Sequence, residues 1–463
     1  MAAVRRPPRL LGAAAFVAAW AVVLAPPAAA HGVGGRTDLP LPLWMFAYGA
    51  GAALVVSFVA LRVLWPRPRL RAASEGAELP GSLERVTSVG VVVGRVVGVA
   101  ALVLVLASAW LGDPSPTDNL APVAVYVVFW VGMQLASALV GDVWRALDPL
   151  DTLAAAGSWA RRRRSSKVVR AERKDLGQWT AAAGLASFVW VELAYHDSAS
   201  PRAVAVWLSL YVVAALAGAA WWGRGWLGHG EGFAVLFSML AHLGPLWRDD
   251  SGRLRVRAPF SGLARYHVMP GTAAVVLVVL GSTTFDGLSR TEFWLGVVCD
   301  SSGWALTALN TLGLVWTVAI MALAYTGATQ LVARITARDW RAMSATFLPS
   351  LVPILLAYTL AHYFSLLVFE GQGAWVLLSD PFGWQWDLFG TAERAIDFTV
   401  LSAATIAYVQ AGSIVVGHIV GVVAAHDRSV ELFRPRLAER SQYPMLGVMV
   451  LYTVGGLGLL LGG

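Results

Sequence analysis

The sequence has almost no cysteine. Cys299 stands alone among 463 residues, so the chain can form no intramolecular disulfide and has no set of thiolates for a zinc or iron–sulfur site. Short catalytic signatures are missing too: there is no G-x-x-x-x-G-K-[ST], H-E-x-x-H, G-x-S-x-G or C-x-x-C motif. These absences argue against a nucleotide hydrolase, a zinc protease, a serine hydrolase whose nucleophile lies in a G-x-S-x-G turn, and a dithiol redox enzyme.

Charged residues are also scarce. They make up 14% of the chain, whereas hydrophobic residues make up 57%, a balance that a soluble domain could hardly keep in water. The formal charge of +7 suggests nucleic acid at first sight, but the basic residues fall between apolar stretches, where they report membrane topology. We therefore predict a polytopic membrane protein with the lipid bilayer as its partner and no nucleic-acid partner.

The first thirty residues have the parts of a secretory signal peptide. Basic residues up to Arg9 precede an apolar run from Leu10 to Leu24, and small residues end at Ala30. Cleavage there would leave His31 as an amino terminus outside the cell. A terminal amine beside an imidazole can chelate copper, so His31 is a candidate metal ligand. The alternative is that it merely follows a cleavage site.

The mature chain, residues 31–463, has the pattern of a single transmembrane domain. We predict an all-α integral membrane protein, a bundle of about ten transmembrane helices in the plasma membrane, because ten apolar stretches have about the length that spans a bilayer. These stretches are Leu43 to Trp65, Val86 to Leu111, Pro122 to Val140, Leu176 to Tyr195, Ala203 to Trp222, Val268 to Phe285, Trp304 to Val332, Phe347 to Phe369, Phe398 to Ala425 and Met445 to Leu461.

One further apolar segment, Gly232 to Trp247, is too short to cross and contains Gly244-Pro245. We expect it to form an interfacial or re-entrant helix. In the second span, Gly90, Gly94 and Gly98 recur every four residues, which predicts close packing against a neighbouring helix.

The basic residues test this topology. With His31 outside, the five inner loops hold 26 of the 35 lysines and arginines, and the outer segments hold Arg36, Arg202, Arg290 and Arg394. This asymmetry follows the positive-inside rule. Residues 141–175, with the run Arg161 to Arg164, are expected as a basic cytoplasmic loop. Anionic lipid head groups could hold this loop, or it could serve as a plain stop-transfer signal.

A histidine lies within the eighth predicted span. His362 has Tyr358 four residues before it, on the same helix face, and that face should point into the bundle because lipid offers an imidazole no partner. His362 is therefore a candidate functional residue, with Tyr358 as a candidate binding residue. The alternative is a structural histidine whose hydrogen bonds are satisfied within the bundle.

Other polar residues are expected at the same outer depth. Glu192 and His196 are four residues apart at the outer end of the fourth span, which places them on one helix face. Tyr195 lies beside them as a second candidate binding residue, and Asp286 begins an outer loop. Two imidazoles, His196 and His362, with two carboxylates could hold a divalent metal and activate water. A carboxylate and a histidine could also act as general acid and base without metal. Alternatively, these are ordinary polar residues at a membrane boundary.

Several stretches resemble a known family. These are His31 to Trp44, Gly141 to Pro149, Phe285 to Ser289, Ala425 to Arg428 and Ser441 to Tyr443. They look like an actinobacterial family of polytopic membrane proteins commonly labelled fenitrothion hydrolase. The resemblance spans nearly the whole mature chain and implies hydrolysis of lipophilic phosphotriesters. It carries no established catalytic residues, and the paired H-x-H ligands of soluble phosphotriesterases are missing, so the activity would need a different site.

Our candidates for that site are His362, Glu192, Asp286 and His196. A pocket between helices could receive a triester from the bilayer. The competing interpretation is a polytopic membrane transporter or a structural membrane subunit without catalysis, because few intramembrane charges and no soluble domain suit those classes equally well.

Overall fold

The computed structural model describes residues 42–164 and 176–461. The signal peptide and His31 lie outside the described residues, as do residues 165–175 of the expected basic loop. Within the described part the chain is almost entirely helical, as an all-α membrane protein should be.

Nine helices of the described chain are long and apolar enough to cross a membrane. They are α2 (Leu43–Leu64), α4 (Gly81–Leu111), the continuous helix α5 (Leu120–Val123), η1 (Ala124–Gly132) and α6 (Met133–Leu139), α10 (Pro201–Trp222), α13 (Thr272–Ser289), α15 (Gly303–Thr336), α17 (Val352–Ser379), α18 (Ala403–Leu432) and α19 (Pro435–Leu461).

The shorter helices connect or fill this bundle. They are α3 (Leu70–Ala73), α7 (Trp144–Leu147), α8 (Pro149–Arg164), α9 (Trp179–Leu193), η2 (Arg224–Trp226), α11 (Leu227–Gly230), α12 (Gly232–Ala241), η3 (Ser261–Arg265), α14 (Glu292–Val298), α16 (Trp340–Phe347) and η4 (Leu348–Leu351). The fourth expected span is α9, which has 15 residues and so reaches only about 22 Å. The described part of the segment expected as a basic loop is largely helical, in α7 and α8.

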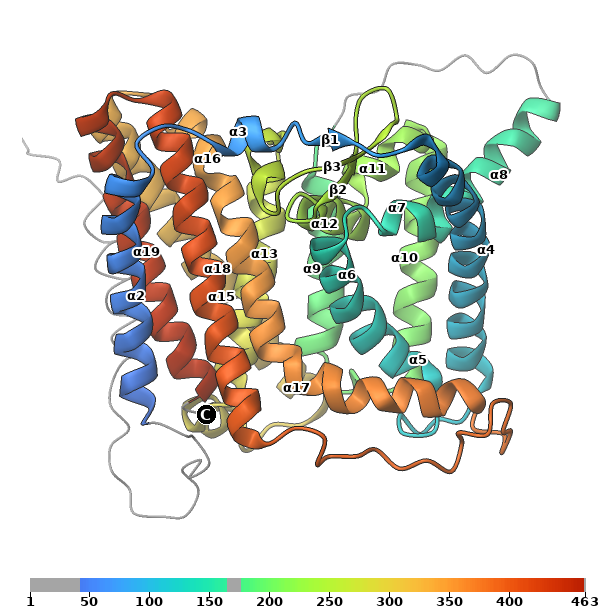
Figure 1. Cartoon of the computed structure of the whole chain (residues 1–463). Coiled ribbons are helices and arrows are strands. Elements are labelled where there is room, and N and C mark those ends of the chain that lie inside the picture. Colours follow the sequence, from blue (N-terminus) through green and yellow to red (C-terminus); the bar gives the residue numbers. More distant parts are fainter. Residues whose placement is uncertain (1–41, 165–175, 462–463) are drawn as a thin grey trace, which may run out of the picture.

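The connections gather at two opposite ends of the bundle. The sheet end carries α3, α8, α16 and three short antiparallel strands in the order β1-β3-β2, namely β1 (Ala77–Glu78), β3 (Leu254–Val256) and β2 (Leu246–Arg248) (Figure 1). The α5 end carries the start of α5 and the second half of α17, which turns to run across it. The loops predicted to lie on the inner side of the membrane are thus at one end of the bundle, and those predicted to lie on the outer side are at the other.

Helix α12 occupies the segment expected at the interface. Its side chains are buried in protein, with Leu236, Phe237, Met239 and Leu240 fully shielded, so it is a core helix that packs against α6 and α9. Both of its connections, to α11 and to β2, lead to the sheet end. Apolar composition alone could not separate burial in protein from burial in head groups.

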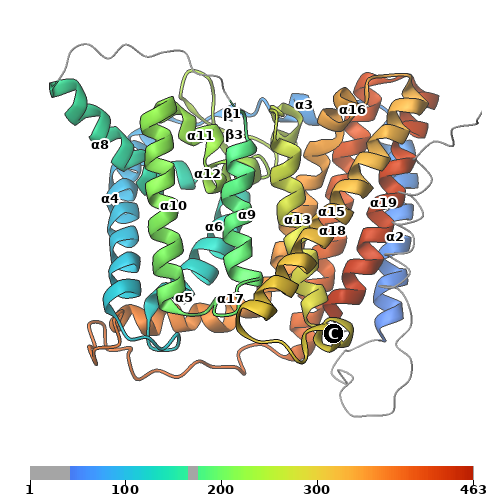
Figure 2. The ribbon, with the colours of Figure 1, turned by 180° about the vertical axis from the view of Figure 1, so that it is seen from behind.

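The packing around α13 positions the candidate site. Gly177 and Gly271 both have positive φ, and the Gln178 amide donates to the Pro270 carbonyl at 2.7 Å, so α9 and α13 begin side by side (Figure 2). A Cβ on Gly271 would overlap the backbone of Gln178 and Trp179. Because both positions need glycine, the two helices start at a fixed level and run in parallel.

The glycine repeat of α4 packs as predicted for part of its length. A Cβ at Gly98 would overlap the Leu147 carbonyl oxygen and one at Gly94 would meet the Ala146 oxygen, whereas Gly90 has nothing within 4 Å. The contact partner is the short helix α7 rather than another span.

We therefore expect Gly98→Val to destabilise the protein, by about 2 kcal/mol or more, because the new side chain must push α7 away from α4. Gly90→Val, the matched change on the same helix, should have little effect. Thermal unfolding of the detergent-solubilised protein measures both. Equal melting temperatures for the two variants would contradict the close contact.

Candidate functional site

Three of the sequence candidates meet inside the bundle. His362 on α17 faces Asp286 on α13, with 3.4 Å between His362 Nδ1 and Asp286 Oδ2, and both side chains are buried. Glu192 on α9 lies within electrostatic range of Asp286. The sequence therefore identified a real cluster, made by one residue from each of three helices.

Helix geometry explains the convergence of the two carboxylates. Since α9 and α13 begin at one level, and Glu192 and Asp286 are the fourteenth and fifteenth residues of these helices, both lie about 20 Å along. The expectation that Asp286 starts a loop was wrong, because α13 continues to Ser289. Its Ser282, Thr283 and Thr284 hydroxyls donate to carbonyls three or four residues earlier, so they do not break the helix.

Arg290 adds a positive charge beside the Asp286 carboxylate. Its Nη2 is 3.1 Å from Asp286 Oδ1, one helical turn away, while most of its side chain is exposed at the α5 end. Asp286 thus bridges a guanidinium and an imidazole. Holding both oxygens fixes the Asp286 carboxylate and, through it, the His362 ring.

Sequence reasoning missed three residues of the cluster, namely Tyr363, Trp130 and Arg290. Tyr363 lies close enough to interact with the Glu192 carboxylate, and Trp130 of η1 lies beside Tyr363. Arg290 was counted only as an outer charge. The signals were present, since Tyr363 follows His362 directly and Arg290 is four residues after Asp286.

The π-helix η1 forms one wall of this cluster. It spans nine residues, from Ala124 to Gly132, and it is followed by Gln134, whose Oε1 accepts a hydrogen bond from Thr359 of α17. Such wide helical turns are frequent at functional sites. No feature of the sequence predicts the π-helix, because its residues are ordinary apolar ones.

Glu192 differs from the other carboxylate in its hydrogen bonding. The residue is partly buried, and its Oε2 is shielded from solvent without a hydrogen-bond partner among the described residues. A polar atom in that state is costly inside a bundle.

His196 does not join the cluster. Helix α9 ends at Leu193, so the assumption of one continuous helix face from Glu192 to His196 was wrong. The exposed His196 ring instead makes a 2.9 Å hydrogen bond through Nδ1 to Thr307 of α15 and packs against Tyr195 and Trp304. Tyr195 therefore belongs to an aromatic group at the α5 end rather than to the Asp286–His362 pair.

Tyr358 shares a face with His362, as predicted, but its hydroxyl is already used. The two rings stack with centroids 6.4 Å apart, and the Tyr358 hydroxyl donates to the Tyr452 carbonyl of α19 at 2.7 Å. A Cβ on Gly456 would overlap the phenol. We therefore interpret Tyr358 as a packing residue between α17 and α19.

The geometry favours general acid–base chemistry over a metal. Among residues 42–164 and 176–461 no group of three or more His, Cys, Asp or Glu side chains is arranged to hold a metal ion. The Asp286–His362 pair suits proton transfer, because the carboxylate orients the ring through Nδ1 and leaves Nε2 as the nitrogen that exchanges a proton.

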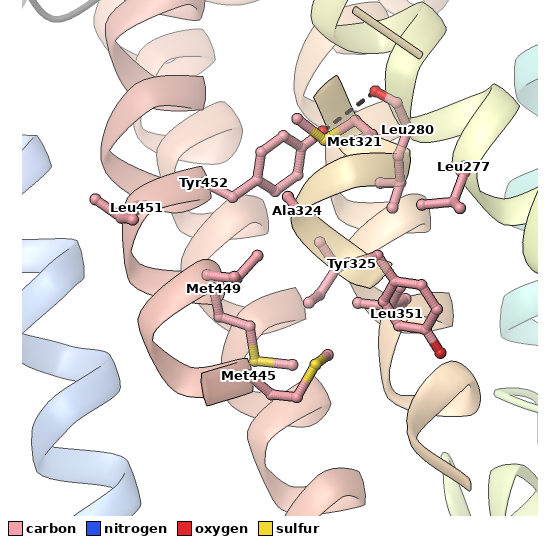
Figure 3. Close-up of a pocket in the computed structure, with 12 residues that line it drawn as sticks. Leu277, Leu280, Met321, Ala324, Tyr325, Leu351, Met445, Met449, Leu451 and Tyr452 are labelled. Atoms are coloured by element: carbon pink, nitrogen blue, oxygen red, sulfur yellow. Dashed lines mark hydrogen bonds between the residues drawn. The ribbon is translucent and has the colours of Figure 1, made fainter. Parts of the chain in front are cut away.

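Two of the cavities in the described part of the bundle differ clearly in size. The first, between α13, α15 and α19, measures about 40 Å³, room for a water-sized molecule, and Tyr452 donates to the Leu280 carbonyl at its edge (Figure 3). The second measures about 270 Å³ and is almost wholly apolar. It lies between α4, α10 and the η1 residues Val125, Val128 and Phe129. Only the second approaches the size of a lipophilic ligand.

The Ala425 to Arg428 stretch serves another purpose. Asp427 is buried and accepts hydrogen bonds from Trp65 Nε1 at 2.7 Å and from the Arg69 amide at 2.6 Å. His426 bonds to the Trp65 carbonyl and to Gln442. These contacts fasten the α2–α3 connection to α18 and α19 at the sheet end.

Comparison of the chain with family models, with curated proteins and with solved structures gave no match. The resemblance to the fenitrothion hydrolase family therefore stays a prediction.

For Asp427→Ala we expect a loss of about 3 kcal/mol of unfolding free energy, because two donors lose their buried, charged acceptor. Asp427→Asn keeps one acceptor oxygen and should lose less. Denaturant unfolding in detergent measures both variants, with Asp397→Ala in the exposed segment before α18 as the control. An unchanged Asp427→Ala protein would exclude this fastening role.

Proposed function

We propose that this chain is a membrane-embedded hydrolase of lipophilic phosphotriesters, and that the Asp286–His362 pair is its general base. The observation that carries the proposal is the contact between these two side chains, which come from different helices and are buried. The family resemblance supplies the substrate class.

The proposed reaction is a displacement by water. His362 Nε2 accepts a proton as the water oxygen bonds to phosphorus, and the phosphorus–oxygen bond to the leaving aryl oxide breaks. Asp286 stabilises the imidazolium that forms, and Arg290 pairs with the other oxygen of the Asp286 carboxylate. The proton then passes to the product aryl oxide or to solvent, which restores the neutral ring.

We also propose how the protein is oriented in the membrane. We place the sheet end in the cytoplasm, since the basic loops gather there, and the α5 end with Arg290 outside the plasma membrane. The signal peptide then ends before an external amino terminus. In this placement α9 is a tenth, short span, and α12 is a re-entrant helix that enters from the cytoplasmic side.

The first test is hydrolysis of an aryl phosphorothioate triester by the purified protein. We expect His362→Gln and Asp286→Asn to lower kcat by about 10²- to 10⁴-fold, the range for loss of a general base. His196→Gln should stay close to the wild-type rate, and a chelator should have no effect. Melting temperature and gel filtration verify that each variant is folded.

Each alternative result has a definite meaning. Equal activity of wild type and His362→Gln would eliminate the proposed base. Loss of activity with His196→Gln and with a chelator would instead favour the divalent metal site, with His31 as one further candidate ligand.

A second candidate function is a proton-coupled carrier. It is favoured by Glu192 Oε2, a shielded carboxylate atom without a described partner, because ionisable groups inside membrane bundles often mark proton pathways. In this function Glu192, Tyr363 and the Asp286–His362 pair would pass protons instead of activating water.

Proton flux into liposomes containing the purified protein tests this candidate. Under a carrier function we expect Glu192→Gln to abolish dye-reported flux, whereas Glu292→Gln, an exposed glutamate on α14, should leave it intact. Flux that is absent from wild type, or equal in wild type and Glu192→Gln, would exclude the carrier function. The hydrolase function would still be decided by the triester assay.

A further inference from the structure

A basic cleft lies at the sheet end, near the start of α13, whereas Asp286 lies near the other end of that helix. It measures about 910 Å³ and is bordered by α3, β2, β3 and η3. Six arginines line it against three carboxylates, namely Arg71, Arg248, Arg255, Arg257, Arg265 and Arg428. The volume and the excess of positive charge suit an anionic ligand.

Most of these arginines have carboxylate partners. Arg71 and Arg428 both pair with Glu431, and Arg255 pairs with Glu78. Such pairs on a partly exposed surface contribute little energy and hold their arginines in place. Arg248 is only partly buried and donates to the Gly252 carbonyl and the Thr87 hydroxyl. The charge that calls for explanation is therefore the one that is buried without a described carboxylate partner.

Arg257 is that charge. It is 7% exposed, and its described hydrogen bonds go to neutral groups: Nε donates to the Gly244 carbonyl at 3.1 Å and Nη2 to the Ala241 carbonyl at 2.9 Å. No described carboxylate lies within ion-pair distance of it. The carbonyls at the end of α12 fix the guanidinium, and Gly262 lets it pack against η3, since a Cβ there would overlap it.

A second guanidinium lies beside the first. Arg257 and Arg265 both lie over the Trp247 ring, at 5.6 and 5.8 Å from its centroid. Arg265 donates to the Ser74 hydroxyl, and its carboxylate neighbour Glu75 is 3.5 Å away and largely exposed. Trp247 Nε1 is shielded from solvent and has no acceptor among the described residues. Two cations and an indole donor without a described acceptor thus lie around one tryptophan, and only Arg265 has a carboxylate neighbour.

The pKa values of Arg257 and His242 agree with this geometry. Burial and the neighbouring Arg265 lower the pKa of Arg257 to about 10. Burial, with Arg257 nearby, lowers the pKa of His242, which also lines the cleft, to about 4. The neighbourhood therefore disfavours further positive charge, as expected where a negative group is missing.

We propose that this cleft binds a phosphate-bearing anion, held by the guanidinium groups of Arg257 and Arg265 beside Trp247. Planar guanidinium groups match phosphate oxygens in pairs, and the fixed Arg257 loses little side-chain freedom on binding. Arginines that only mark membrane topology need no burial, because water and head groups solvate them. The buried position of Arg257 beside the cleft is therefore consistent with a ligand there, in addition to its contacts with the α12 carbonyls.

The phosphate group could belong to a soluble compound or to a lipid head group, and two probes separate these sources. The full-length protein in nanodiscs of neutral phosphatidylcholine is titrated with pyrophosphate by calorimetry. Its melting temperature is also compared between phosphatidylcholine nanodiscs and nanodiscs containing phosphatidylglycerol. Binding of pyrophosphate supports a soluble ligand, and stabilisation by phosphatidylglycerol alone supports a lipid head group.

Variants connect either signal to the cleft. We expect Arg265→Gln and Arg257→Lys to weaken pyrophosphate binding at least tenfold, or to abolish the stabilisation by phosphatidylglycerol. Arg253→Gln, the same type of charge change on the exposed hairpin between β2 and β3, should alter either signal less than twofold. If Arg257→Lys fails to fold, Trp247→Phe is the second variant that tests the same cleft, because it removes the indole N–H and keeps an aromatic ring.

The proposal is overturned if neither probe gives a signal with the wild-type protein. It is overturned equally if Arg253→Gln weakens the signal as much as Arg265→Gln does, since that result would mean unspecific attraction to a basic surface. Neither result depends on the hydrolase assay, because the cleft and the Asp286–His362 pair share no residue.

Discussion

Polar groups inside this bundle have to find partners within the protein, on their own helix or on a neighbouring one, because lipid offers them none. That constraint is strongest around α13, whose span is the most buried of the described chain. Its hydroxyl residues bond within the helix, and Asp286 reaches across to α17. The arrangement of α9, α13 and α17 follows from satisfying these few groups together.

The glycines at the starts of α9 and α13 serve the same arrangement. Gly177 and Gly271 bring the two helices together at the sheet end, and equal lengths of helix then carry Glu192 and Asp286 to one depth. A site some 20 Å away is thus positioned by backbone contacts that contain no functional group. Helices are stiff enough to transmit such a register over that length.

The two ends of the molecule differ in which of their charged groups have partners. Near the α5 end, Asp286 is paired with both a guanidinium and an imidazole, which leaves Glu192 Oε2 as the unsatisfied atom. At the sheet end the unmatched group is a cation, Arg257. The groups without described partners are therefore a carboxylate oxygen at one end and a guanidinium at the other.

The sequence by itself determined the membrane class, the positions of the apolar helices and the residues His362, Glu192 and Asp286 as members of a polar group. It could do so because helix length and hydrophobic composition are local properties, and because a buried ionisable side chain is rare enough to be noticed. Only the tertiary structure decided that His196 turns away to Thr307, that Tyr363 and Arg290 belong to the cluster, and that α12 is covered by protein. Those outcomes depend on where α9 stops and on which helices become neighbours, and such contacts between distant segments leave no periodic trace in the chain.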